Sequence, residues 1–403
     1  MTIDLTDPAI RHDPYPLYAH LRATRPVTRA RVPLFGEAWL VTRYDDVVRG
    51  LKHPGLTNDL RNTDPWLRRL NDAWWLPTAL RGFYDNLLSL DDPAHRRLRN
   101  LVHQAFTPAR VDHLAGEIAR IADDLLDHLP RTGPVDLVAD YALPLPLRVI
   151  STMLGVPPGD HQTFHTWSSR FLDVGVGDLA ALWRQIPNTI RMRRFFARLI
   201  ALRRTQPGDD LLTGLIQANE AGDRLSQDEL VAMIFLLLLA GHETTVNLIA
   251  TGVLTLLQHP DQLQQLREQP ALIDRAIEEV VRFGNPVEFS SIRSALTDVD
   301  IGAQVIRPGS RVIFLLASAN RDAQIFANPE HLDITRDPNR HVGFGFGIHY
   351  CLGVPLARLE GRLAIQKLIA RFPRLQLAIA PEQLAWRRAL AVRGLRSLPV
   401  VLG

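Results

Sequence analysis

The stretch GFGFGIHYCLG, residues 343–353, combines a thiol, an imidazole and four glycines, residue types that could bind a metal or a metal-containing cofactor. It contains Cys351, the single cysteine among 403 residues, with His349 two positions earlier. Cysteine acts as a ligand or a nucleophile in its thiolate form, which needs electropositive surroundings. A single cysteine excludes an intramolecular disulfide and any multi-cysteine zinc or iron–sulfur site. A nucleophile working with His349 is disfavoured, because residues two apart on an extended loop point apart.

The sequence after Cys351, LGVPLARLEGRLAIQKL, predicts a helix. Its apolar residues recur at spacings of four, three and four: Leu352, Leu356, Leu359 and Leu363. Pro355 is compatible only with the first turn of such a helix. Cys351 would therefore lie at a helix N-terminus, where free amides and the helix dipole favour an anion. The glycines lack side chains that would block a broad, flat group, and they let backbone N–H groups point at the sulfur. The alternative explanation is a buried structural thiol beside a glycine-rich turn.

A second polar group lies inside the most apolar part of the sequence. A capping box at Ser226 begins a predicted helix, and no proline follows until Pro260, so the helix is about 30 residues or roughly 45 Å long. AGHETT, residues 240–245, places an acid and two threonines near its middle. Thr244 can donate its hydroxyl to the carbonyl of Ala240, which bends helices. A satisfied polar kink is the simplest explanation of the motif taken alone.

The ordered set around Cys351 resembles the haem-binding loop of the cytochrome P450 family. Six positions match the pattern F-G-x-G-x-[HR]-x-C-x-G: Phe344, Gly345, Gly347, His349, Cys351 and Gly353. The resemblance extends over nearly the whole sequence, in the order of the family's motifs. It implies the cytochrome P450 fold as a single domain over residues 1–403, mainly α with small β-sheets near the N-terminus and around residues 287–318. It also implies haem b (iron protoporphyrin IX) between the long central helix and the post-cysteine helix, with Cys351 as the iron ligand.

The resemblance assigns roles to residues outside the loop. Glu243 and Thr244 correspond to the acid–alcohol pair that guides protons to dioxygen, and Ala240 and Gly241 correspond to the small residues that leave room for it. Four basic residues correspond to positions that bind the haem propionates in related bacterial enzymes: His95, Arg99, Arg293 and His349.

Glu279 and Arg282 match the family's E-x-x-R pair, which is buried and holds the segment before the cysteine loop. An arginine usually completes this network. His331 stands at the corresponding position here, which departs from the family pattern. The sequence leaves open whether His331 or Arg336 completes the network.

By the same analogy the substrate pocket draws on residues 58–90 and 162–195, and on six single positions: His242, Val287, Phe289, Ser290, Leu390 and Ala391. The first segment is rich in aromatic residues, which favours a hydrophobic substrate such as a terpenoid, a fatty acid or a polyketide. The sequence does not indicate the substrate itself, the site of oxidation or the assembly state.

The resemblance implies a haem-thiolate monooxygenase that inserts one oxygen atom from O2 into a hydrophobic substrate by hydroxylation or epoxidation. No flavin or iron–sulfur domain fits within the sequence, so we expect electrons from a ferredoxin and its reductase. Four arginines are candidate contacts for the ferredoxin on the cysteine side of the haem: Arg96, Arg97, Arg358 and Arg362. Two alternatives keep the haem. A peroxide-driven peroxygenase usually lacks the acid–threonine pair, and a non-enzymatic haem-based sensor would not need it.

Composition and motifs exclude several other classes. The net charge is only +3 and no arginine-rich run occurs, so we expect no nucleic-acid partner. The strongly apolar run at residues 233–240 is shorter than the roughly 20 residues that cross a bilayer, and the polar N-terminus lacks a signal-peptide core. We therefore expect a cytoplasmic protein with no membrane contact. HETTV begins like the zinc-protease motif H-E-x-x-H, but Val246 occupies the place of its second histidine.

Overall fold

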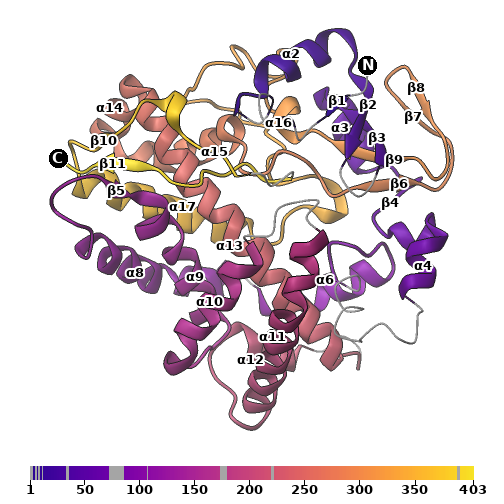
Figure 1. Cartoon of the computed structure of the whole chain (residues 1–403), viewed down its shortest axis with the longest axis horizontal. Coiled ribbons are helices and arrows are strands. Elements are labelled where there is room, and N and C mark those ends of the chain that lie inside the picture. The colour runs from indigo at the N-terminus through magenta and orange to yellow at the C-terminus, as the bar shows by residue number, and fades with distance from the viewer. Residues whose placement is uncertain are drawn as a thin grey trace.

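The computed structural model describes the chain except for residues 1–2, 5–6, 8–9, 11, 33–35, 72–85, 107, 173–178, 219–221 and 388–390. The described part is mainly helical with small β-sheets, as the sequence predicts. Figure 1 shows most helices on one side of the molecule and the largest sheet on the other. The longest helix, α13 (Gln227–Gln258), runs through the middle between them.

The start of α13 is the predicted capping box. The Glu229 N–H donates to the Ser226 hydroxyl at 3.2 Å, and the Ser226 N–H donates to the Glu229 carboxylate at 2.7 Å. These bonds satisfy two amides that the first turn of a helix leaves without partners. By length and composition α13 is apolar enough to cross a membrane, but 61% of its most apolar window is buried inside the protein. It is therefore the core helix of this fold.

Helix α13 crosses α17 (Val354–Arg371), the helix that follows Cys351, at two glycines. A Cβ atom added to Gly361 would lie 3.0 Å from Leu248 Cδ2, and one added to Gly252 would lie 2.8 Å from Ile365 Cδ1. A larger residue at either glycine would force these side chains to shift. The contacts follow the same order along both helices, so the two helices run in the same direction where they cross.

This parallel crossing places the AGHETT motif and Cys351 on the same side of it. Thr244 lies four residues before Leu248, which is about 6 Å along α13. Cys351 directly precedes the N-terminus of α17. The motif and the thiol therefore face the same region, between the N-terminal parts of the two helices.

The largest sheet has six strands in the order β1-β2-β3-β9-β6-β4. We expected small sheets near the N-terminus and around residues 287–318; the structure joins these regions into one sheet, because β3 (Gly36–Val41) pairs in parallel with β9 (Arg311–Phe314). Local patterns do not reveal such a long-range pairing. The other strands of this sheet are β1 (Ile3–Asp4), β2 (Val27–Val32), β4 (Leu56–Thr57) and β6 (Arg293–Ala295).

Two smaller sheets lie at the periphery (Figure 1). One joins β10 (Gln376–Leu377), β11 (Pro399–Val401) and β5 (Val135–Asp136), and the other is the hairpin of β7 (Val299–Ile301) and β8 (Gln304–Ile306).

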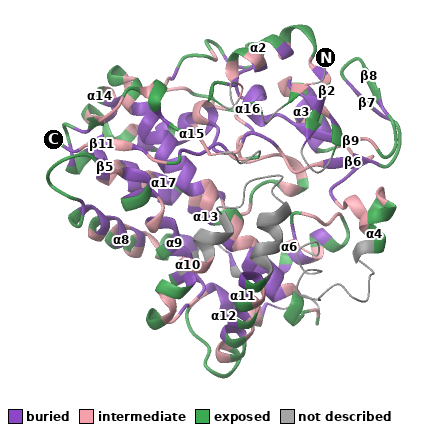
Figure 2. Ribbon diagram, viewed as in Figure 1, coloured by how far each residue is buried: buried purple, intermediate pink, exposed green. Residues whose placement is uncertain are grey.

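Further helices pack around the centre. Buried residues gather where α13, α15 and α17 meet, whereas the outer turns of the surrounding helices are exposed (Figure 2). The helices that matter for the site are α6 (Ala94–Ala105), which carries two of the predicted propionate ligands, and α15 (Ile273–Gly284), which carries the E-x-x-R pair. The others around α13 are α8 (Ala115–Asp127), α9 (Pro144–Met153), α10 (His161–Leu172), α11 (Leu179–Thr205) and α12 (Leu211–Gln217).

Candidate functional site

The glycine-rich loop before α17 is held by its own backbone. The Cys351 N–H donates to the Phe344 carbonyl at 3.0 Å. Gly345 and Gly347 have φ angles of 74° and 77°, a left-handed conformation that favours glycine. A Cβ atom on Gly347 would also lie 2.9 Å from the carbonyl oxygen of Leu51. The loop therefore requires glycine at these two positions to bring Cys351 into place.

Cys351 lies at the N-terminus of α17, as predicted. Its sulfur accepts hydrogen bonds from the backbone N–H groups of Gly353 and Val354. Cys351 is exposed. Protein atoms nevertheless desolvate the sulfur, and this raises the pKa of the thiol, against the lowering influence of the two amides and of Arg99. Because burial favours the neutral thiol, a cation such as a metal ion would have to stabilise the thiolate.

Three buried nitrogens beside the cysteine loop have no hydrogen-bond partner in the described part of the chain. They are Nε2 of His95, Nε2 of His349 and Nε of Arg293. The two imidazole rings are neighbours, with centroids 4.3 Å apart. Arg99 lies next to the loop, where its guanidinium donates to the Tyr350 carbonyl at 2.8 Å. The structure thus brings together the four residues predicted to bind propionates.

The electrostatics of this cluster fit an anionic ligand. Burial, together with the nearby His95, Arg293 and Arg99, lowers the pKa of His349 to about 3. Burial lowers the pKa of Arg293 to about 10. Buried donors and cations gathered in this way are costly unless an acceptor or an anion satisfies them. The donor set therefore fits the two carboxylates of haem.

The AGHETT segment of α13 presents small residues at an open face. Ala240 and Gly241 are exposed although they belong to the core helix, and a Cβ atom on Gly241 would meet no other atom within 4 Å. The Thr244 hydroxyl donates to the Ala240 carbonyl at 2.6 Å, as predicted, and the Thr245 hydroxyl donates to the Gly241 carbonyl at 2.8 Å. This face leaves room for a flat group between α13 and the cysteine loop.

The E-x-x-R pair is buried completely. Arg282 and Glu279 form a two-bond ion pair, with both N···O distances 2.7 Å, and neither side chain is exposed. The remaining Arg282 N–H groups donate to the carbonyls of Asn320, Pro329 and His331 at 2.8–3.0 Å. These carbonyls belong to the irregular segment that leads to the cysteine loop, so the ion pair holds that segment on α15.

Arg336, and not the His331 side chain, completes this network. Arg336 Nε lies 3.2 and 3.3 Å from the two oxygens of Glu279. His331 is exposed and contributes its backbone carbonyl, which accepts from Arg282 and Arg336. Of the two residues that the sequence left open, Arg336 therefore contributes the third side chain, and His331 does not. Asn339, which the sequence did not single out, also donates to Glu279 at 3.0 Å.

The structure describes five of the six predicted pocket residues, and their role in a substrate pocket stays a prediction. His242 is completely buried, so it does not border the open face of α13. Phe289 is buried in the core cluster of Tyr18 and Leu40. The Ser290 hydroxyl is bound to backbone, because it donates to the Ser291 carbonyl and accepts from the Phe314 N–H.

Val287, Phe289 and Ala391 lie close together, because the N–H groups of Glu288 and Phe289 both donate to the Ala391 carbonyl, at 2.9 and 3.4 Å. Val287 packs against the core cluster that contains Val41 and pairs with Val392 in an isolated bridge. Ala391 is exposed and accepts the Glu288 N–H. Leu390 lies outside the described residues.

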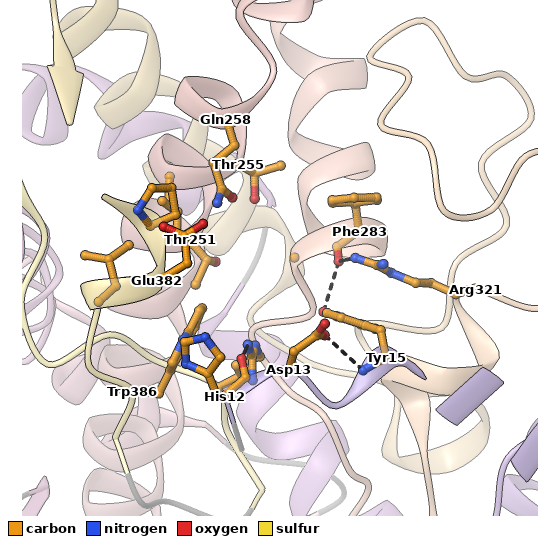
Figure 3. Close-up of a pocket in the computed structure, with 15 residues that line it drawn as sticks. His12, Asp13, Tyr15, Thr251, Thr255, Gln258, Phe283, Arg321, Glu382 and Trp386 are labelled. Carbon is orange, nitrogen blue, oxygen red and sulfur yellow. Dashed lines mark hydrogen bonds between the residues drawn. The ribbon is translucent and has the colours of Figure 1, made fainter. Parts of the chain in front are cut away.

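A pocket of about 260 Å³ lies elsewhere, beside the C-terminal half of α13 (Figure 3). Thr251, Thr255 and Gln258 line one wall, and Tyr15 and Trp386 come from the two ends of the chain. Neither Cys351 nor the AGHETT segment lines it. The pocket is therefore separate from the cysteine site.

Two of the four candidate docking arginines have acidic partners of their own. Arg97 pairs with Asp223 and Glu229, and Arg358 makes two bonds of 2.7 Å to Glu278. The other two are more loosely held: Arg96 lies 3.8 Å from Asp92, and Arg362 lies 3.5 Å from Asp274.

Comparison with known proteins shows which family the chain resembles. The family model "Cytochrome P450" matches residues 183–377. The polyketide biosynthesis cytochrome P450 PksS of Bacillus subtilis is 41% identical, over 97% of this chain and 96% of its own. Its solved structure superimposes with a TM-score of 0.91 over 99% of both chains, at 40% identity.

Two further relatives carry substrate names. The vitamin D(3) 25-hydroxylase of Pseudonocardia autotrophica is 45% identical over 99% of this chain and 96% of its own. The 6-deoxyerythronolide B hydroxylase of Saccharopolyspora erythraea is 40% identical over 99% of this chain and 98% of its own.

Replacing Arg336 by alanine should lower the free energy of unfolding by about 1.5–3 kcal/mol, because a hydrogen bond to the buried Glu279 carboxylate is lost. Replacing His331 by alanine keeps its carbonyl and should change stability by less than about 0.5 kcal/mol. Denaturant unfolding of both variants measures the difference. A larger loss in the His331 variant would contradict the assignment of Arg336.

Proposed function

The chain belongs to the cytochrome P450 family, and from this membership we propose which of its residues carry out the reaction of the family. The protein is a haem b monooxygenase that transfers one oxygen atom from O2 to a hydrophobic organic substrate. When bound, the haem supplies the activation of dioxygen. The parallel crossing of α13 and α17 carries the proposal, because it brings the AGHETT segment and Cys351 to the same region.

Cys351 is the residue we assign as the haem ligand. It is the only cysteine of the sequence, and two amides at the start of α17 donate to its sulfur. These donors hold a thiolate in a fixed direction and moderate its basicity. His95, Arg293 and His349 would then bind the propionates with the nitrogens that have no partner in the described part of the chain, and Arg99 would add its charge beside the loop.

Replacing Cys351 by serine should abolish the red-shifted Soret band of the ferrous carbon monoxide complex, because that band requires a thiolate ligand. Absorption spectra of the reduced protein, with wild type as the control, test this. Retention of the band in the variant would disprove the assignment.

Thr244 and Glu243 are the residues we assign to proton delivery. The Thr244 hydroxyl donates to the Ala240 carbonyl, which leaves its oxygen free to accept a hydrogen bond from a water molecule. Glu243 is half-buried on the preceding position of the helix. An acid beside a hydroxyl at the open face can pass protons from the protein to the reacting oxygen.

Replacing Thr244 by alanine should uncouple the reaction: NAD(P)H consumption continues, product falls by roughly 10-fold or more, and hydrogen peroxide rises. Thr245 offers a matched control, since its hydroxyl makes the same kind of bond to Gly241 but its side chain is buried. The amount of product formed per NAD(P)H consumed, measured in both variants, tests the role of Thr244 in coupling. Equal coupling in the two alanine variants would refute the role of Thr244.

We propose that electrons come from a small acidic ferredoxin that docks beside Cys351. Ile348 and Tyr350 expose apolar surface there, 46% and 39% of each residue. Arg96, on α6, adds a largely exposed positive charge. An apolar centre with cationic neighbours fits a transient interface with an acidic partner.

The rate of ferredoxin-dependent reduction should fall steeply with ionic strength, and replacing Arg96 by glutamate should lower it by roughly 3–10-fold at low salt. Arg307 on the peripheral β7–β8 hairpin is similarly exposed, and its glutamate variant serves as the control (Figure 1). Stopped-flow reduction measures the rates. Salt-independent rates, or equal losses in both variants, would contradict docking at this surface.

We propose a large hydrophobic substrate of the polyketide type. One relative is named for polyketide biosynthesis, and two others are named for 6-deoxyerythronolide B and for vitamin D(3). All three names point to large carbon skeletons and none to a small polar molecule.

A macrolactone such as 6-deoxyerythronolide B should shift the haem spectrum from low to high spin at lower concentration than vitamin D3 or a long-chain fatty acid. Spectral titration with the three compounds measures the affinities. A tighter response to either of the other two would reassign the substrate class.

The acid–threonine pair also favours a monooxygenase over a peroxygenase or a haem sensor, because neither of these needs proton delivery to dioxygen. A cytoplasmic location fits dependence on soluble electron carriers, and recovery of the protein in the membrane fraction of lysed cells would contradict it.

A further inference from the structure

A second network of charged side chains lies beside the buried E-x-x-R pair and contacts the cysteine loop. Its members are Glu278 on α15, His341 in the irregular segment and Arg358 on α17. Of the three, the sequence singles out only Arg358, as a candidate docking residue. We call these three side chains the Glu278 network.

Glu278 is the centre of this network. Arg358 donates to it with two parallel bonds, Nε to Oε1 and Nη2 to Oε2, both 2.7 Å. His341 Nε2 lies 3.1 Å from Oε2. Burial alone would raise the pKa of Glu278, but the hydrogen bonds from His341 and Arg358 hold it down at about 2. Glu278 is therefore an ionised acceptor for both partners.

His341 connects this carboxylate to the start of the cysteine loop. Its side chain is only 3% exposed. Its Nδ1 lies 3.2 Å from the Gly343 N–H and accepts from it, so the ring proton belongs on Nε2, where it donates to Glu278. Gly343 is itself fixed on α15, because a Cβ atom there would lie 2.5 Å from Val281 Cγ1.

Phe344 is held between the Glu278 network and the core. The His341 ring lies 5.7 Å from the Phe344 ring, and the Arg358 guanidinium lies 5.5 Å from it. On the other side Phe344 packs against the buried cluster of Leu248, Val280 and Val281. The Phe344 carbonyl accepts the Cys351 N–H. The position of Phe344 therefore determines where the backbone of Cys351 lies.

Arg358 reaches the loop from the other direction. It lies seven residues after Cys351 on α17 and also hydrogen-bonds the side chain of Tyr350, the residue before the cysteine. The Glu278 network thus joins α15, α17 and both ends of the loop.

From these contacts we infer that Glu278, His341 and Arg358 are positioning residues that fix the Cys351 loop and thereby the amide hydrogen bonds to the sulfur. The inference rests on the proposed role of Cys351 as the haem ligand. Amide donors withdraw electron density from a thiolate, so loosening them strengthens its donation to iron and lowers the reduction potential of the haem.

The test uses the haem-loaded full chain and a redox titration. His341→Phe keeps an aromatic ring against Phe344 but removes both hydrogen bonds. We expect the ratio of reduced to oxidised haem at a fixed potential to fall up to about tenfold, which corresponds to about 59 mV for a one-electron couple. A larger share of the ferrous carbon monoxide complex should also lose the red-shifted band.

Glu278→Gln has a matched control on the same two helices. Asp274→Asn weakens the Asp274–Arg362 contact, which also joins α15 to α17, but no contact of that pair reaches the loop in the described part of the chain. The Glu278 variant should change the potential and the carbon monoxide spectrum, and the Asp274 variant should not. The double variant His341→Phe with Glu278→Gln should shift the potential no further than the larger single change, because both act on one loop position.

Potentials and spectra of the His341 and Glu278 variants equal to those of Asp274→Asn would overturn the inference, even if the variants unfold at lower temperature. A wild-type protein without the red-shifted band would instead refute the ligand role of Cys351, so the two failures are distinguishable.

Discussion

The close parallel crossing of α13 and α17 is the constraint on which the rest of the structure depends. Gly252 and Gly361 allow each helix backbone to accept a large side chain of the other, Ile365 and Leu248. Packing this tight leaves little freedom in the relative position of the helices. On the N-terminal side of the crossing, the open face at Gly241 shows that α13 is not tightly packed there. A flat cofactor needs this combination of a fixed contact and an adjacent gap.

A second constraint explains how an irregular segment can hold a reactive loop. Taking the Glu279–Arg282 pair out of water is costly, and a buried ion pair is weak evidence for stability by itself. Here the pair also satisfies three backbone carbonyls and gains Arg336 and Asn339 as further donors. Backbone groups that would otherwise form a helix or a strand are thus satisfied by side chains. The segment can remain irregular and still be rigid.

Local features were predictable from the sequence, and long-range ones were not. The capping box at Ser226 and the bond from Thr244 to Ala240 both depend on residues within four positions of one another. Arg336 completes the Glu279 network although it lies 57 residues further along the sequence. No local sequence pattern indicates such a distant contact. Family analogy places Phe289 at the pocket, whereas the tertiary packing buries it in the core cluster of Tyr18 and Leu40.

The two networks on α15 show how one helical turn can hold both the irregular segment and the cysteine loop. Consecutive residues of a helix are about 100° apart, so Glu278 and Glu279 point in different directions from one backbone. Glu279 faces the irregular segment, and Glu278 faces the cysteine loop and α17. A displacement of α15 would therefore move both supports of the loop together. The helix acts as a common frame, and the loop geometry depends on its position relative to α13 and α17 as well as on the glycines within the loop.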